Sequence, residues 1–205
     1  GVALATVNPR LSPQEVVAIC DDAGARVVFA DAESAAALRD AALATKPVII
    51  AIGPEFEAWL ARAMPATSLP PVREWDDFTI PYTSGTTGKP KGVLVPHRSR
   101  ILTLFGMAVE YGCYAPDDRF LALAPMCHGA GMIFSLAPVF FGGYAEIIDR
   151  FEPEEVLARL GSQHITGFFA VPTHFHALLS AGAAGLAGSR NAPLKAVISN
   201  AAALP

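Results

Sequence analysis

The chain has little charge, few cysteines and no leader pattern. Lys, Arg, Asp and Glu make up 17% of its 205 residues and the net charge is −4, so no basic surface for nucleic acid is indicated. Its three cysteines, Cys20, Cys113 and Cys127, lack the CxxC spacing of metal and redox motifs. Their odd number argues against a disulfide framework and for a reducing compartment. We therefore expect a cytoplasmic protein with no nucleic-acid partner.

Residues 120–145 carry no formal charge, which raises the question of a membrane span. Pro125, His128 and Pro138 interrupt this run, and a glycine pair follows at 142–143. A buried strand followed by a core helix fits these interruptions better than a membrane-spanning helix does. The sequence therefore predicts no membrane span.

Apolar sequence is abundant, at 52% of residues, and strand-like runs alternate with amphipathic helical patterns. Such alternation is typical of an α/β fold with mostly parallel sheets flanked by helices. Strands are expected at 1–7, 26–30, 48–52, 78–83, 92–97, 119–124, 144–148, 165–170 and 196–199. Helices are expected at 13–23, 32–44, 55–63, 99–112, 130–141, 153–160 and 173–180.

Local signals support two of these assignments. Ser12 and Glu15 form a capping-box pattern with Pro13 at the first helical position, and Gly24 can close that helix in a left-handed conformation. Three prolines fall within residues 64–77, which form the best internal connector.

The most distinctive segment is YTSGTTGKPKGV at residues 82–93. Glycines let backbone N–H groups approach phosphate oxygens, hydroxyls add directional donors, and lysines add compact positive charge. It is not a Walker loop, because Pro90 follows Lys89 and only two residues separate the glycines. We predict that this segment binds a polyphosphate through nine residues: Thr83, Ser84, Gly85, Thr86, Thr87, Gly88, Lys89, Lys91 and Gly92.

Simpler interpretations remain open for individual residues. The segment could be an ordinary surface turn between two strands, with both lysines as solvated charges. Ser84 lies in TSGTT rather than in the GxSxG elbow of serine hydrolases, so a nucleophilic serine is weakly supported. A thiol nucleophile at Cys127 has little support, because a buried cysteine is usually inert. A zinc site at His174 and His176 has little support either, because the expected helix turns the two side chains apart and no third ligand is evident.

The segment at 82–93 resembles the phosphate-binding signature of the adenylate-forming superfamily, which includes acyl- and aryl-CoA synthetases, luciferases and peptide-synthetase adenylation domains. Residues 1–31 resemble the stretch upstream of that signature, and LAPMCHGAGM at 123–132 resembles the downstream Pro-x-x-His-x-x-Gly element. The resemblance covers most of the chain. It implies that residues 1–205 are a truncated N-terminal AMP-binding domain, without the small C-terminal catalytic domain and its lysine.

The resemblance also implies a reaction. A carboxylate attacks the α-phosphate of MgATP, an acyl-adenylate and pyrophosphate form, and CoA then takes the acyl group. Lys91 and Lys89 would supply charge to the phosphates. His128 would border the acyl pocket, where Cys127 replaces the aromatic residue common in the family. The partners would be ATP, Mg²⁺, CoA and a fatty or aromatic carboxylic acid, within fatty-acid or related metabolism.

One departure and several alternatives accompany this hypothesis. Residues 199–202 read Ser-Asn-Ala-Ala where the family commonly has a Ser-Gly-Gly-Ala-like turn, so substrate fit is in question. The adenine- and magnesium-binding motifs of the family lie beyond residue 205, so we expect this chain alone to be inactive. A non-catalytic nucleotide-binding scaffold and a peptide-synthetase adenylation domain are the alternatives. The oligomeric state stays open, a homodimer included.

Overall fold

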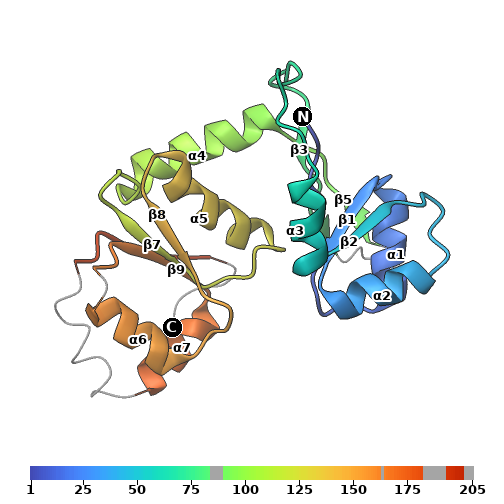
Figure 1. Ribbon diagram of the computed structural model, residues 1–205. Coiled ribbons are helices and arrows are strands. Elements are labelled where there is room, and N and C mark those ends of the chain that lie inside the picture. Colours follow the sequence, from blue (N-terminus) through green and yellow to red (C-terminus); the bar gives the residue numbers. More distant parts are fainter. Residues whose placement is uncertain (84–89, 163, 182–192, 201–205) are drawn as a thin grey trace. The chain divides into compact units, whose positions relative to one another are not determined.

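The computed structural model describes residues 1–83, 90–162, 164–181 and 193–200 (Figure 1). The chain divides into two compact units, Gly1–Arg100 and Ile101–Pro205, and each is described by itself. Helix α4 (His97–Tyr111) begins in the first unit and continues into the second.

The first unit holds three helices and six strands among the residues that the structure describes, besides the start of α4. Its first part alternates helix and strand, and its second part consists of short antiparallel pairs. In chain order these elements are α1 (Pro13–Asp22), β1 (Val27–Ala30), α2 (Ala32–Asp40), β2 (Val48–Ala51), α3 (Pro54–Ala61), β3 (Asp77–Thr79), β4 (Tyr82–Thr83), β5 (Lys91–Gly92) and β6 (Val95–Pro96).

Strands β1 and β2 pair in parallel, with Val28 opposite Ile49. Because side chains alternate across a strand, Val28 and Ile49 face α1 and α2, while Phe29 faces α3. The Phe29 ring lies edge-on to Phe56 and Trp59, with centroid separations of 5.6 and 5.7 Å. Helices therefore cover both faces of this small sheet (Figure 1). The core on the α1–α2 side contains Cys20, Leu38 and Leu43.

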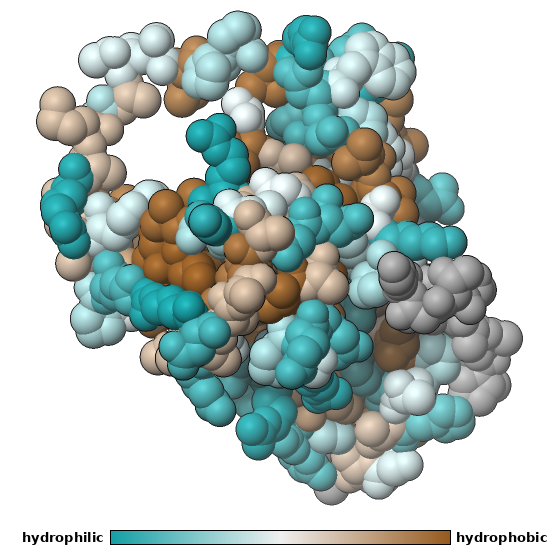
Figure 2. Space-filling model, turned by 90° about the vertical axis from the view of Figure 1, so that its right-hand side faces the viewer, coloured by the Kyte–Doolittle hydropathy of each residue, from teal (hydrophilic) through white to brown (hydrophobic). Residues whose placement is uncertain are grey.

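The cover over β1 and β2 is incomplete. Val27 and Val48 lie opposite each other in the pairing register and remain 44% and 57% exposed. Hydrophobic residues also reach the surface of the face drawn in Figure 2, where they lie among hydrophilic ones. A two-stranded parallel sheet thus leaves apolar area in contact with solvent, although parallel strands are usually buried on both faces.

The capping box that begins α1 is confirmed, because the Ser12 hydroxyl accepts from the Glu15 N–H and the Glu15 carboxylate accepts from the Ser12 N–H. The predicted end of the next helix at residue 44 is wrong, because α2 stops at Asp40. The Asp21 carboxylate accepts from the N–H groups of Ala44 and Thr45, at 3.2 and 3.1 Å. The N–H groups of Ala44 and Thr45 are therefore satisfied by the Asp21 side chain of α1 instead of by a continued α2.

The two strands predicted around the glycine-rich segment are each broken. Strand β3 pairs with β6 and β4 pairs with β5, both antiparallel. Between β3 and β4, the Ile80 N–H donates to the Leu4 carbonyl, and Pro81 has no N–H to donate. The strand predicted at residues 1–7 is also wrong, because the segment forms a single bridge between Leu4 and Thr79.

The second unit contains a four-stranded sheet in the order β10-β9-β7-β8, with every adjacent pair parallel. This confirms the predicted α/β class with a parallel sheet and flanking helices. After α4 its elements are β7 (Arg119–Ala122), α5 (Gly129–Phe140), β8 (Tyr144–Ile147), α6 (Pro153–Ser162), β9 (Gly167–Ala170), α7 (Pro172–Ser180) and β10 (Ala196–Ser199).

The two faces of this sheet bury different aromatic residues. Phe120 and Phe169 pack toward α4 and α5, where the rings of Phe134 and Phe169 stack with centroids 4.3 Å apart. On the opposite face, Leu121 and Phe168 pack with side chains of α6 and α7. The result is a three-layer arrangement of helix, sheet and helix within this unit (Figure 1).

The prediction for the uncharged run at 120–145 is confirmed, because it forms the buried strand β7 and then α5, a largely buried helix. Within the described parts of the chain, no helix combines the length and apolarity needed to cross a membrane.

A buried carboxylate joins the amino-terminal ends of the strands. The Asp118 side chain is 0% exposed, accepts from the Ala115 N–H at 2.8 Å and lies 2.7 Å from the Lys195 ammonium. Burial alone would raise the pKa of Asp118, but the hydrogen bonds from Lys195 and Ala115 hold it below its usual range. Asp118 therefore ties the segment before β7 to the start of β10.

Asp118→Asn is expected to lower the free energy of unfolding by about 2 kcal/mol near neutral pH, because it replaces a charge-assisted pair whose lysine is half exposed. A carboxyl whose folded pKa is depressed adds stability above its unfolded pKa of about 4, and that stability is lost as pH falls through the folded value. Denaturant unfolding against pH should show a smaller acid loss in Asp118→Asn. The control is Asp117→Asn, at an exposed neighbour. Equal stability of the two variants would contradict the assignment.

Candidate functional site

The glycine-rich segment begins and ends in a hairpin. Strands β4 and β5 place Thr83 opposite Lys91 and Tyr82 opposite Gly92. Directly opposed residues of an antiparallel pair share one face, so the Thr83 and Lys91 side chains leave the hairpin on the same face, and both residues are exposed. The hairpin thus brings three of the nine predicted phosphate ligands together. The other six lie outside the described residues: Ser84, Gly85, Thr86, Thr87, Gly88 and Lys89.

Gly92 is constrained by packing on the hairpin's other face. A Cβ atom there would lie 2.9 Å from Ile80 Cγ2 and 3.0 Å from Tyr82 Cζ. Atoms do not approach that closely, so a larger residue would displace the Tyr82 ring. The sequence predicted this glycine from phosphate approach alone, and the structure adds a packing requirement that spacing could not reveal.

The Tyr82 hydroxyl donates a hydrogen bond of 2.6 Å to the Asp22 carboxylate at the end of α1. Burial and this hydrogen bond both raise the pKa of Tyr82, so the phenol stays protonated and remains a donor at neutral pH. Sequence analysis missed this contact, because the two residues are 60 positions apart.

The second unit has a recognisable ligand edge. The chain passes from β7 through α5 to β8 on one side, and from β9 through α7 to β10 on the other. Helices α5 and α7 cover opposite faces of the sheet. The carboxyl ends of β7 and β9 are therefore a topological switch point, where open α/β sheets bind ligands.

His128 lies at the end of the turn that follows β7, next to this switch point. It is the N-cap residue of α5, is exposed, and has an extended backbone with φ −93° and ψ 145°. Its N–H donates to the Pro125 carbonyl at 3.0 Å, and its carbonyl accepts from the Met132 N–H at 2.9 Å. The imidazole accepts no capping hydrogen bond from the first-turn N–H groups of α5, and the residue lies at the edge where a ligand would lie.

Gly131 explains why the turn before α5 is so tight. A Cβ atom at Gly131 would overlap the Pro125 carbonyl oxygen and lie 2.7 Å from the Ala124 carbonyl oxygen. The turn after β7 therefore packs directly against the backbone of α5. The sequence showed the glycine within the Pro-x-x-His-x-x-Gly element, but the reason for it required coordinates.

The first residue of the histidine pair packs against an aromatic ring. His174 and His176 lie on α7, and the His174 ring stacks on Phe151 with a centroid separation of 4.2 Å. Burial lowers the pKa of His174, which favours the neutral ring. Over 1–83, 90–162, 164–181 and 193–200, no group of three or more His, Cys, Asp or Glu residues could hold a metal ion. The three cysteines all lie in these ranges and form no disulfide.

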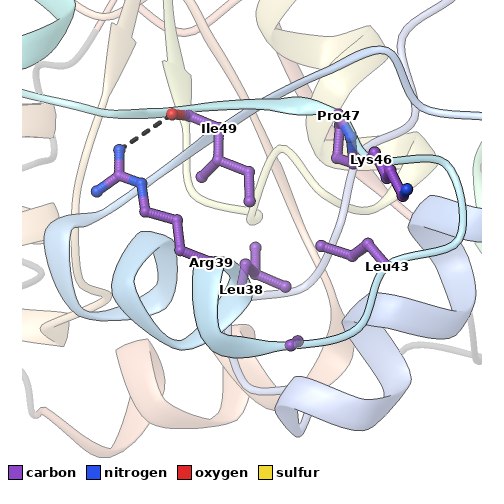
Figure 3. A pocket seen from close by; sticks show the side chains of 7 residues that line it. Leu38, Arg39, Leu43, Lys46, Pro47 and Ile49 are labelled. Carbon is purple, nitrogen blue, oxygen red and sulfur yellow. Dashed lines mark hydrogen bonds between the residues drawn. The ribbon is translucent and has the colours of Figure 1, made fainter.

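An open depression lies between α2 and β2 in the first unit (Figure 3). Its cation Arg39 already donates to the Ile49 carbonyl at 3.0 Å and to both carboxylate oxygens of Glu55. The remaining charge, Lys46, is exposed at the rim. An incoming anion would have to displace Glu55, so we assign no ligand to this depression.

The second unit has a parallel sheet with a topological switch point, and the first unit has a hairpin that bears glycine, threonine and lysine. Both features are typical of α/β proteins that bind ligands. The chain matches the family model of the AMP-binding enzymes over residues 1–205, and it belongs to that family. The resemblance noted from the segment at 82–93 is thereby confirmed.

Two similar proteins are CoA ligases. The chain is 30% identical over 208 residues to a 4-chlorobenzoate–CoA ligase of Pseudomonas sp. (strain CBS-3), covering 98% of the chain and 38% of that ligase. It is 34% identical over 136 residues to the medium/long-chain-fatty-acid–CoA ligase FadD8 of Mycobacterium tuberculosis, covering 66% of the chain and 23% of that ligase. The chain therefore spans well under half the length of either relative.

The fold is that of adenylate-forming CoA ligases. The inhibitor-bound N-terminal domain of FACL13 from Mycobacterium tuberculosis superposes with a TM-score of 0.83 at 25% identity, covering 97% of this chain and 50% of that one. A malonyl-CoA ligase complex with methylmalonyl-CoA and AMP gives 0.78 at 28% identity, covering 100% and 42%.

Proposed function

We propose that this chain is the truncated N-terminal domain, residues 1–205, of an AMP-forming acid–CoA ligase. The full-length protein would activate a carboxylic acid with MgATP to an acyl-adenylate and transfer the acyl group to CoA. The observation that carries the proposal is the β4–β5 hairpin, which pairs Thr83 with Lys91, the two ends of TSGTTGKPK, in a chain of the AMP-binding family.

The hairpin would hold the β- and γ-phosphates of ATP. Attack by a carboxylate on the α-phosphate expels pyrophosphate, so charge builds up on the leaving group in the transition state. Thr83 would donate a hydrogen bond and Lys91 a positive charge to that group. Ser84, Thr86 and Thr87 would add hydroxyl donors, Gly85, Gly88 and Gly92 would allow close backbone approach, and Lys89 would add charge.

When bound, Mg²⁺ would supply positive charge that offsets part of the charge of the phosphates. The described residues offer no cluster of three carboxylate, imidazole or thiolate ligands for it, so its protein ligands are not assigned and no step is derived through it. In nucleotide sites this ion takes only one or two protein carboxylates, so a site shared with the rest of the polypeptide fits that chemistry.

His128 would border the acyl pocket at the β7–β9 switch point. A substrate carboxylate with a pKa near 4 is ionised at neutral pH, so adenylation needs no general base. His128 would therefore shape or gate the pocket rather than remove a proton. Cys127, half-buried beside it, would narrow the pocket less than an aromatic residue would.

The acid panel tests this function. Full-length protein is incubated with ATP, Mg²⁺, CoA and either aromatic or fatty acids, and AMP formation is measured. Robust AMP formation with at least one class is expected, in line with relatives that act on 4-chlorobenzoate and on medium- and long-chain fatty acids. ATP binding without AMP formation from any acid would instead support a non-catalytic nucleotide-binding scaffold.

The isolated chain is expected to be inactive. Purified residues 1–205 should show no carboxylate-dependent exchange of pyrophosphate into ATP above background, while the full-length protein should. Circular dichroism provides the control that the isolated chain is folded. Robust exchange by residues 1–205 would contradict the proposal that further parts of the ligase are required.

A peptide-synthetase adenylation domain is the second candidate, because the chain is 27% identical over 188 residues to tyrocidine synthase 3 of Brevibacillus parabrevis, covering 87% of the chain and 3% of that protein. The acceptor separates the two functions. Transfer to CoA supports the ligase, whereas transfer only to a carrier-domain phosphopantetheine supports the synthetase.

We also propose that the ligase reaction takes place in the cytoplasm, as the cysteine pattern led us to expect.

A further inference from the structure

We propose that Asp22 and Tyr82 act as positioning residues that hold the β4–β5 hairpin ready for ATP. This inference rests on the proposed function, because it concerns the same phosphate site. Neither residue would touch the nucleotide. They would act through Thr83 and Lys91, the pair next to Tyr82 and Gly92 in the hairpin register.

The hairpin is too small to hold its own position. Among the described residues it contains two register pairs, Tyr82 with Gly92 and Thr83 with Lys91, and a hydrogen bond of 3.0 Å from the Val93 N–H to the Pro81 carbonyl leads from it to the short β3–β6 pair. Isolated two-stranded hairpins are marginally stable in water even when they are longer. Its orientation therefore depends on the adjoining β3–β6 pair and on side-chain contacts with the rest of the first unit.

The Tyr82 side chain provides such a contact. Its hydroxyl donates to the Asp22 carboxylate over 2.6 Å, a charge-assisted bond at the short end of the usual range. Asp22 is the last residue of α1, a helix packed into the core around Cys20 and Leu38. The hydrogen bond therefore connects the base of the hairpin to a rigid element.

Gly92 completes the arrangement from the opposite strand. The Tyr82 ring lies close over the backbone of Gly92, where a Cβ would come 3.1 Å from the Tyr82 hydroxyl oxygen. The ring therefore has one strand beneath it and α1 at its tip. Tyr82 occupies one face of the hairpin, which leaves Thr83 and Lys91 on the other.

The consequence for ATP is pre-organisation. Ordering a loose hairpin costs free energy at the moment of binding, and a contact that orders it beforehand removes that cost. The phosphates meet the hairpin both in the bound substrate and in the transition state, so loss of the contact should weaken both about equally. We call the contact between Asp22 and Tyr82 the clamp. Its loss should therefore change the KM for ATP more than kcat.

The test uses Tyr82→Phe, which removes the hydroxyl and keeps the ring over Gly92. In the full-length protein, the dissociation constant for ATP and the KM for ATP are expected to rise roughly threefold to tenfold, the loss of one exposed hydrogen bond to a charged group. The kcat should fall less than twofold. Asp22→Ala should match it, and Asp22→Asn, which keeps an acceptor oxygen, should recover part of the affinity.

A double-mutant cycle and two controls complete the experiment. The Tyr82→Phe/Asp22→Ala double variant should bind ATP no more weakly than either single variant. Tyr144→Phe, at an exposed tyrosine of the second unit, should change neither constant. Three results would each overturn the clamp: additive losses of ATP affinity in the double variant, wild-type ATP affinity in Tyr82→Phe, or a lower kcat at unchanged KM. If any one of them occurs while Lys91→Met still weakens ATP binding, the clamp is wrong and the proposed function stands. Absence of ATP binding by the wild type would reject the proposed function with it.

Discussion

Gly131→Ala is expected to lower the free energy of unfolding by about 3 kcal/mol, at the upper end of the cost of overpacking. The added methyl group would overlap the Pro125 carbonyl oxygen, and the other close atoms are also backbone, so no side chain can rotate away. Either α5 or the turn after β7 must move. Because that turn ends at His128, the same substitution should also disturb the proposed acyl site.

Gly129→Ala provides a matched control in the same helix. A Cβ at Gly129 meets nothing within 4 Å, and alanine favours helix over glycine by about 1 kcal/mol. Denaturant unfolding should therefore show unchanged or higher stability for Gly129→Ala and a clear loss for Gly131→Ala. Equal stabilities would mean that α5 and the turn after β7 do not pack as described.

Lys91→Met is expected to reduce kcat/KM for ATP in the full-length ligase by about 100-fold. Methionine keeps much of the length of the side chain but removes the charge offered to the departing pyrophosphate, and removing one donor to developing charge typically costs a factor of 100 to 1,000. Unlike loss of the Tyr82 hydroxyl, loss of this charge should lower kcat itself.

Arg26→Met is the control for loss of one surface cation in the same unit, because Arg26 is exposed and precedes β1. Steady-state kinetics with a saturating acid and CoA should show wild-type constants for Arg26→Met. If Lys91→Met also turned over normally, Lys91 would be a solvated surface charge.

Thr86→Ala, within the segment at 82–93, should lower turnover of the full-length ligase as well.

Local patterns predicted the elements well where the determining interactions were short-range. The capping box at Ser12 and Glu15 is confirmed, and the alternating pattern correctly indicated a parallel sheet with flanking helices. The predicted end of α2 was wrong because a residue far along the chain binds the backbone there. The Asp21 carboxylate accepts from the N–H groups of Ala44 and Thr45, and no helix-stop signal at residues 41–44 reveals this contact.

The sequence predicts the kind of candidate site but not its arrangement. Hydroxyl, glycine and lysine in one segment indicate phosphate binding, which stays a prediction for these residues, in a chain of the AMP-binding family. The pairing of Thr83 with Lys91 required the strand register, and the place of His128 at a switch point required the strand order. The Asp22–Tyr82 contact spans 60 positions and carries no motif.

Glycine shows the limit of motif reasoning most clearly. Gly92 belongs to the phosphate signature and Gly131 to the histidine element, yet both have a packing reason in the described structure. Tyr82 covers Gly92, and the Pro125 carbonyl covers Gly131. A motif can thus contain residues that shape its support as well as residues that would meet the ligand.

A crystal structure of the full-length protein with ATP tests the central claim most directly. We expect the β- and γ-phosphates within hydrogen-bond distance of the Thr83 hydroxyl and the Lys91 ammonium. Phosphate density elsewhere, with the face of the hairpin that carries Thr83 and Lys91 exposed to solvent, would contradict the account.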